Sequence, residues 1–240
     1  YAYRKRHLPS VGYFITGSAL VFAWCLLCIF ELSTLDLRLR EGLVNAMYIP
    51  IPFTALMWFL LAHSFTRQKR IFHWNPIALL AAIPTITVVL ALTNPEHRFM
   101  FGPATLEGEN GTLYLTRDLH AWFWVHTIYS YLLIVSGSIA IIRYVIRRGG
   151  IFWRQGRTMV IGALVPFLAN MLYLGYNDSF MRHDLTSVSL AFALALFAWG
   201  LFKYRLFDLV PIARSSLFDC TDDLVFILDA YARVVDVNPA

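Results

Sequence analysis

Aromatic and polar side chains gather toward one end of the last three apolar stretches of this chain, where they could recognise a ligand. Indole and phenol rings, an imidazole, an amide and a carboxylate are groups that fix the orientation of a small molecule in a pocket. Polar side chains in hydrocarbon also form interhelical hydrogen bonds worth about 0.6–2 kcal/mol, which is the simpler interpretation of Asn45 and Asn170. The candidate ligand or signal residues are Trp122, His126, Tyr129, Asn170, Tyr173 and Asp184.

The spacing of the residues does not support metal binding, catalysis or proton-coupled transport. His97, His120 and His126 do not recur at a helical i, i+4 spacing with a carboxylate, so we expect no metal site. No glycine-rich phosphate loop and no activated nucleophile are visible, so we expect no catalytic residue and no bound cofactor in this chain. No carboxylate lies near the centre of an apolar stretch, which argues against a proton-coupled transporter.

These residues are positioned by six uncharged stretches of about 18–22 residues, the length at which a helix crosses a bilayer. The chain of 240 residues is 58% hydrophobic and 15% charged, against about 25% charged in soluble domains. Because only helices satisfy their own backbone in lipid, we predict an all-α integral membrane bundle. The spans are Val11–Phe30, Val44–Phe65, Pro76–Thr93, Ala121–Ile142, Met159–Tyr176 and Leu185–Phe202.

Prolines interrupt these stretches at Pro50, Pro52, Pro84 and Pro166. Each frees a backbone carbonyl and bends a helix, and neighbouring helices must satisfy the freed group. Such a bend serves either as a hinge for a signal or as a fixed feature of shape, and the sequence leaves both open.

Basic residues segregate between the two sets of loops. Thirteen lie on one side and five on the other, and all nine acids before Asp208 lie with the five. The richer side is predicted to face the cytoplasm, so the tail after the sixth span is cytoplasmic too. This distribution accounts for the net charge of +5, and we expect no nucleic-acid partner. The richer side holds Arg4, Lys5, Arg6, Arg67, Lys69, Arg70, Arg143, Arg147, Arg148, Arg154, Arg157, Lys203 and Arg205.

Three regions follow from this pattern: a membrane bundle over residues 1–205, a cytoplasmic linker helix over 206–222 and a soluble beginning over 223–240. The longest outer loop, Asn94–His120, is expected to be partly ordered over the mouth of the bundle. Leu206–Phe218 has apolar residues near helical spacing, which suits a helix that pairs with its copy in a dimer or simply connects. Leu224–Leu228 and Arg233–Val237 are predicted to pair as a hairpin.

Two parts of the chain resemble known protein families. Residues 223–240 resemble the opening of a PAS domain, with Ala232 where the usual turn glycine stands. The rest resembles the seven-helix amino-terminal sensor region of bacterial and archaeal histidine kinases, whose first helix we expect to precede Tyr1. The matching pieces are Thr93-Asn-Pro-Glu-His97, Arg154-Gln155, Pro166…Asn170…Tyr173, Asp184-Leu-Thr186 and Arg205-Leu-Phe-Asp-Leu-Val-Pro-Ile-Ala-Arg214.

The resemblance implies a sensory input module in a bacterial or archaeal cytoplasmic membrane, acting as a homodimer on a small-molecule or lipid-borne stimulus. ATP and magnesium would be needed only in a kinase domain beyond this chain, which would act on a response regulator. A diguanylate cyclase could read the same exit helix, and a transporter or channel with a regulatory PAS tail is the alternative from a different class. The candidate relay residues are Pro166, Arg205, Asp208, Pro211 and Arg214.

Overall fold

The computed structural model describes residues 9–67, 74–109, 112–175, 186–203, 223–224, 226–228 and 234–237. The chain divides into two compact units, residues 1–204 and 205–240, which are described separately. In the first unit the helices are α1 (Pro9–Ser33), α2 (Leu37–Met47), α3 (Ile51–Arg67), α4 (Trp74–Leu92), α5 (Asn94–His97), α6 (Ala121–Arg148), α7 (Gly150–Gly175) and α8 (Thr186–Lys203), with strands β1 (Thr105–Glu109) and β2 (Thr112–Thr116).

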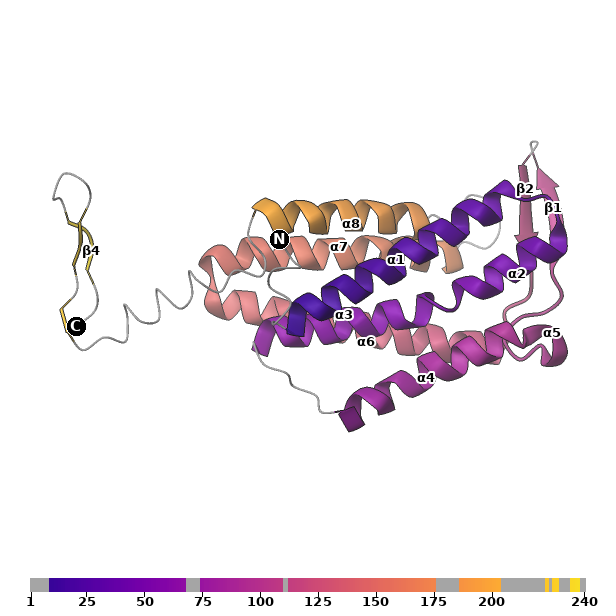
Figure 1. Cartoon of the computed structure of the whole chain (residues 1–240), viewed down its shortest axis with the longest axis horizontal. Helices are drawn as coiled ribbons and strands as arrows, with labels where there is room; N and C mark the ends of the chain where they lie inside the picture. Colours follow the sequence, from indigo (N-terminus) through magenta and orange to yellow (C-terminus); the bar gives the residue numbers. More distant parts are fainter. Residues whose placement is uncertain are drawn as a thin grey trace. The chain divides into compact units, whose positions relative to one another are not determined.

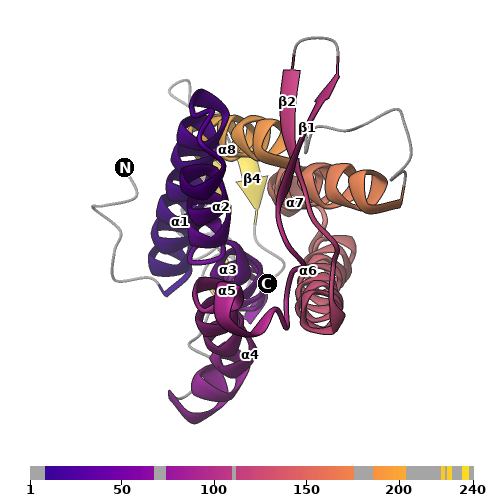
Figure 2. The same cartoon turned by 90° about the vertical axis from the view of Figure 1, so that its right-hand side faces the viewer.

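Five long helices of the first unit form a closed ring of contacts. Helix α3 packs against α1 and α6, α7 packs against α6 and α8, and α8 returns to α1. Helix α4 lies outside this ring, in contact with α2, α3 and α6. Figure 1 shows these helices side by side, and Figure 2 looks along them from the end that carries β1 and β2.

The centre of the bundle is built around α3. Leu56 and Leu60 of this helix are almost fully buried and form an apolar cluster with Ala55 and with Leu133 of α6. By contrast, the outward faces of the helices expose large apolar side chains such as Leu79, which is 78% exposed. Exposed apolar surface on this scale is stable in lipid and would be costly in water.

Four helical segments are long and apolar enough to cross a membrane: Ser10–Ser33, Leu37–Arg67, Ala121–Arg148 and Trp153–Gly175. Shorter apolar helices, Pro76–Leu92 and Val188–Phe197, occupy the places of the third and sixth predicted spans. Among the described residues, therefore, the prediction of membrane helices is confirmed for four spans, whereas the count of six is not.

The second predicted span is not one unbroken helix. Residues Tyr48–Pro50 form a turn between α2 and α3, so the stretch Val44–Phe65 begins in one helix and continues in another. Pro52 is accommodated in the first turn of α3, where its missing N–H leaves no bond unmade. In contrast, Pro84 and Pro166 lie inside the continuous helices α4 and α7.

The loop Asn94–His120 contains a hairpin that the all-α prediction missed. Strands β1 and β2 pair antiparallel from Thr105 opposite Thr116 to Glu109 opposite Thr112. A further bridge joins Phe101 to Leu119, so the loop returns along itself toward α6. The expectation that this loop is partly ordered is thus confirmed, with a strand pair in addition to the short helix α5.

The second unit contains the strands β3 (Phe226–Leu228) and β4 (Val234–Val237). They pair antiparallel, with Phe226 opposite Val237 and Leu228 opposite Val234. This confirms the predicted hairpin within the part of the chain that the structure describes. The predicted linker helix over 206–222 lies outside the described residues.

Candidate functional site

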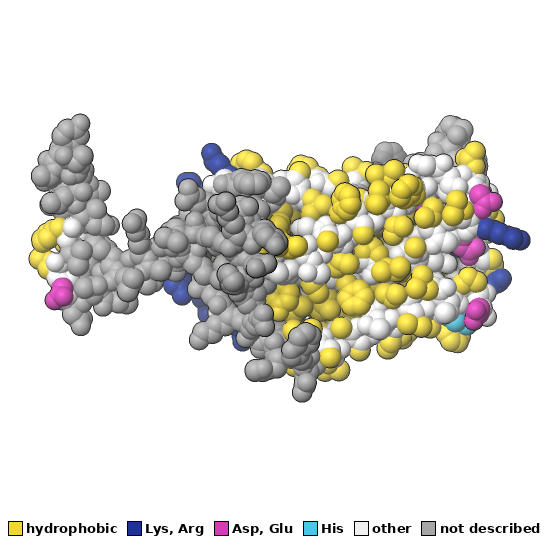
Figure 3. All heavy atoms as spheres, viewed as in Figure 1, with side chains coloured by type: hydrophobic (Ala, Val, Ile, Leu, Met, Phe, Trp, Pro, Cys, Tyr) yellow, Lys and Arg dark blue, Asp and Glu magenta, His cyan; other side chains and the backbone are white. Residues whose placement is uncertain are grey.

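The two ends of the bundle differ in charge, as Figure 3 shows: the described charges at one end are basic, whereas the other end carries acids together with arginines. One end, here called the basic end, holds the charged residues at the last turn of α3, the α6–α7 connection and the last turn of α8. The other, the acidic end, holds the α1–α2 junction, α5 and the hairpin. The acids at the acidic end include Glu31, Asp36, Glu41, Glu96 and Asp118, and strand β1 adds Glu107 and Glu109.

Two of the predicted ligand residues instead hold α4 onto α6. The indole Nε1 of Trp122 donates to Thr87 Oγ1 at 3.1 Å, and the hydroxyl of Tyr129 donates to the Leu80 carbonyl oxygen at 2.6 Å. Leu80 lies four residues before Pro84, whose ring removes the N–H that would bond this carbonyl. Tyr129 therefore satisfies the acceptor that Pro84 frees.

Asn170 joins three helices at their acidic-end halves. Its Oδ1 accepts from the Tyr131 hydroxyl of α6 at 2.7 Å, and its Nδ2 donates to Thr186 Oγ1 of α8 at 3.3 Å. Tyr131 also packs edge-on against Phe167 of α7, with ring centroids 4.7 Å apart. This interhelical chain fixes the start of α8 relative to α6 and α7, one turn beyond Pro166.

The remaining predicted residues do not complete one pocket with these. His126 is buried, packs edge-on against Tyr48 with centroids 6.0 Å apart, and has its Nδ1 3.4 Å from Ser130 Oγ. Tyr173 lies close enough to Arg117 to influence it electrostatically. Asp184 lies outside the described residues. The six predicted residues thus divide between an α4–α6 contact, an α6–α7–α8 contact and a group near Tyr48.

The Thr93–His97 segment has a clear structural role. Asn94 is 1% exposed, and its Oδ1 accepts from the backbone N–H groups of Met100 and Phe101 at 3.1 and 3.0 Å. Its Nδ2 donates to the Phe101 carbonyl at 3.0 Å. One buried amide therefore folds the chain over residues 94–101, and this fold places Phe101 at the acidic end.

Arg117 is the functional candidate that the sequence analysis missed. Its Nη1 donates to Asn45 Oδ1 of α2 at 2.8 Å, and its Cζ lies 3.4 Å from the centroid of the Phe101 ring. Burial lowers the pKa of the Arg117 guanidinium, while Tyr48, Glu41 and Tyr173 act in the opposite direction. The buried Asn45 within an apolar stretch was the one signal in the sequence that a polar partner had to approach α2.

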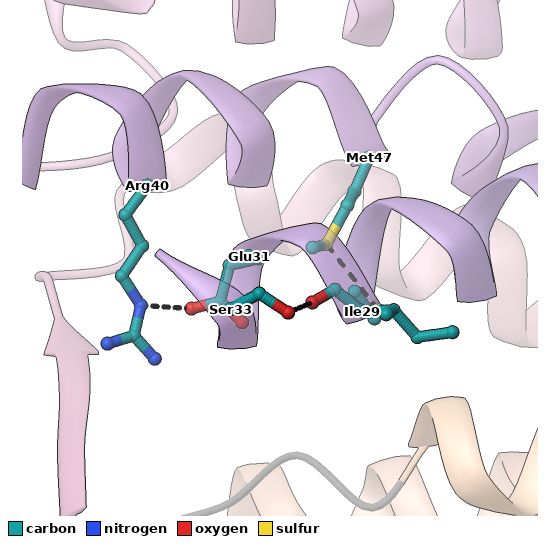
Figure 4. A network of polar contacts seen from close by, with 6 residues as sticks. Ile29, Glu31, Ser33, Arg40 and Met47 are labelled. Carbon is teal, nitrogen blue, oxygen red and sulfur yellow. Dashed lines mark hydrogen bonds and ion pairs between the residues drawn. The ribbon is translucent and has the colours of Figure 1, made fainter. Parts of the chain in front are cut away.

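A second arginine at the same end forms an ion pair with a carboxylate. Figure 4 shows Arg40 reaching from α2 to Glu31 near the end of α1, beside the Ser33 hydroxyl that donates to the Ile29 carbonyl. Arg40 is 4% exposed, so this ion pair is buried and holds α2 against α1. The pair explains how a charged residue is tolerated next to the apolar bundle.

Of the predicted relay residues, the structure describes only Pro166, which is buried in α7. Helix α7 approaches its neighbours closely on both sides. A Cβ at Gly156 would lie 2.2 Å from Val145 Cγ1 of α6, and one at Gly162 would lie 2.9 Å from Phe197 Cε2 of α8. The other relay residues, Arg205, Asp208, Pro211 and Arg214, lie outside the described part of the chain.

Apolar helices with uncharged centres, exposed apolar faces and charged ends define a multi-helix membrane protein. Residues 1–211 match the family described as the N-terminal 7TM region of histidine kinase, and the chain belongs to this family. It is therefore a membrane sensory input region of the kind that histidine kinases carry. The match confirms the resemblance for the membrane part and ends before residues 223–240, whose likeness to a PAS domain stays a prediction. A comparison with curated proteins finds no match.

Proposed function

We propose that this chain receives a stimulus at the acidic end of its bundle and relays it through α8 to a cytoplasmic PAS domain and a histidine kinase. The family match over residues 1–211 is the observation that carries this proposal. In the proposed arrangement the chain crosses the membrane six times. Helices α4 and α8 are the two spans in addition to the four longer segments. The acidic end faces outward because the basic end holds the excess of arginine and lysine.

The interhelical chain through Asn170 supports α8 as the moving element. Its two hydrogen bonds join the acidic-end halves of α6, α7 and α8, and α8 is the last described helix before the exit from the membrane. A stimulus that alters the position of Tyr131 or Asn170 would change the position of α8 relative to α6 and α7. Close packing at Gly162 against Phe197 would transmit that change along α8, since packed interfaces shift between discrete arrangements.

The same function requires several partners. The protein acts as a homodimer in a bacterial or archaeal cytoplasmic membrane, surrounded by lipid, with a small-molecule or lipid-borne stimulus. ATP, magnesium and the response regulator belong to the kinase beyond this chain. A diguanylate cyclase as output would leave the input mechanism unchanged.

A fusion of residues 1–240 to a PAS-linked kinase core tests the relay. We expect Thr186→Val and Asn170→Leu to change the basal autophosphorylation rate severalfold. Each variant removes the hydrogen bond that holds α8 against α7, and an interhelical hydrogen bond of this kind contributes about 0.6–2 kcal/mol. Ser136→Ala is the matched control, since among the described residues its hydroxyl bonds only the Leu133 carbonyl of its own helix, at 3.1 Å. Autophosphorylation that is identical in all four proteins, with equal membrane amounts, would contradict the relay through α8.

A further inference from the structure

Arg117 differs from Arg40 of the same end in the kind of group that it contacts, an amide oxygen in place of a carboxylate. A guanidinium carries five N–H donors, and Arg117 donates one of them, to Asn45 Oδ1. Within the described part of the chain no carboxylate forms an ion pair with it, whereas Arg40 is paired with Glu31. A partly buried guanidinium with spare donors presents a planar edge that matches an oxyanion in two parallel hydrogen bonds.

The groups around Arg117 favour the binding of an anion by its guanidinium over a further contact within the protein. Phe101 covers one face of the guanidinium and leaves its edges to other partners. Tyr48 and Tyr173 influence Arg117 electrostatically, as does Glu41, which is not within ion-pair distance. A charge taken partly out of water without a counter-ion costs free energy, and a bound anion would remove that cost.

The same place offers apolar surface. Phe101 forms a buried cluster with Ala91, Met100 and Phe123, and Tyr48, Trp122 and Leu174 pack against that cluster. Tyr48 joins the ring of Phe101, 5.2 Å away between centroids, to the ring of His126. Among the described residues, His126 Nε2 has no hydrogen-bond partner, so it adds a polar group beside the aromatic rings.

We propose that Arg117, with Asn45, Tyr48 and His126, forms a binding site for a small oxyanion that carries an apolar or aromatic body. The oxyanion is a carboxylate or a phosphate ester, supplied either as a soluble molecule or by a lipid headgroup. The inference rests on the proposed function only in that the bound anion would be the stimulus or a part of it.

The test uses the whole chain in dodecyl maltoside, a detergent without phosphate or carboxylate. The melting temperature is followed during titration with benzoate, phenyl phosphate and short-chain phosphatidylglycerol, with benzamide as the uncharged analogue. We expect saturable stabilisation by at least one anion and none by benzamide. Arg117→Gln should weaken that binding roughly 10- to 100-fold, because charge-assisted hydrogen bonds are lost. Stabilisation by phosphatidylglycerol alone would assign the anion to a lipid.

Two further variants distinguish a specific role of the Arg117 guanidinium from a general effect of positive charge. Arg117→Lys keeps the charge without the planar fork and should bind with intermediate affinity. Arg38→Gln removes an exposed arginine of the same end and should bind as the unaltered chain does. The site is overturned if none of the three anions stabilises the unaltered chain saturably, or if Arg117→Gln binds equally well. Because no kinase is present, a negative result leaves the relay test through Asn170 unaffected, and the reverse also holds.

Discussion

Tyr129 and Pro84 act as a pair across the contact of α4 with α6. The hydroxyl donates at 2.6 Å to the Leu80 carbonyl that the proline leaves without a helical partner. Tyr129→Phe should therefore lower the free energy of unfolding by about 0.6–2 kcal/mol. After Pro84→Ala, residue 84 regains its N–H and bonds Leu80 itself, so the same change should cost less than about 0.5 kcal/mol.

Unfolding of the four proteins of this double-mutant cycle in mixed detergent micelles measures the coupling. Tyr13→Phe serves as the control, because no hydrogen bond of its hydroxyl is found among the described residues, and it should cost the same with and without Pro84. Equal costs for Tyr129→Phe in both backgrounds would mean that the tyrosine does not act through the carbonyl that the proline frees.

At the scale of the helix, α7 depends on glycine where it meets α6. A Cβ at Gly156 would lie 2.2 Å from Val145 Cγ1 and 3.1 Å from Ile141 Cγ2, both on buried side chains. Gly156→Ala must therefore move α7 or its neighbours, at a cost of about 1–3 kcal/mol for overpacking. Gly12→Ala in α1 is the control, because no atom lies within 4 Å of its added Cβ and the helix gains in propensity.

Thermal unfolding in detergent shows whether each variant is less or more stable than the unaltered chain. We expect the melting temperature to fall for Gly156→Ala and to stay level or rise for Gly12→Ala. A fall of equal size in both would show that the helices tolerate no added methyl group anywhere, rather than a specific close contact between α6 and α7.

The helices could be predicted from the sequence because long uncharged apolar runs have one stable solution in lipid. The hairpin β1–β2 has one strong signal in the sequence, Asn110-Gly111 between short strands, which the all-α prediction did not include. The pairing of Tyr129 with Leu80 could not be foreseen, since the acceptor is a backbone carbonyl and reveals no side-chain pattern. Arg117 could not be predicted as a site residue, because its position over Phe101 depends on the fold that Asn94 sets.

For the whole molecule, the proposed orientation follows from the difference in charge between the two ends of the bundle. Apart from the charged residues at the helix ends, the described segments crossing the bundle are uncharged, so the ends alone carry the topological information. In the proposed orientation the arginines of the α6–α7 connection lie on the cytoplasmic side. The candidate anion site around Arg117 would then face outward, where a soluble molecule could reach it.

Labelling of single cysteines in intact cells tests this orientation. With Cys25, Cys28 and Cys220 replaced by serine, a membrane-impermeant maleimide should modify Asp36→Cys and Glu96→Cys, which are exposed at the acidic end. Arg148→Cys, exposed at the basic end, should react only after the cells are permeabilised. The reverse pattern would place the site around Arg117 in the cytoplasm, where it could sense only an internal anion. A mixed pattern, with one acidic-end position protected, would mean that the number of crossings between α1 and α5 differs from the proposed one.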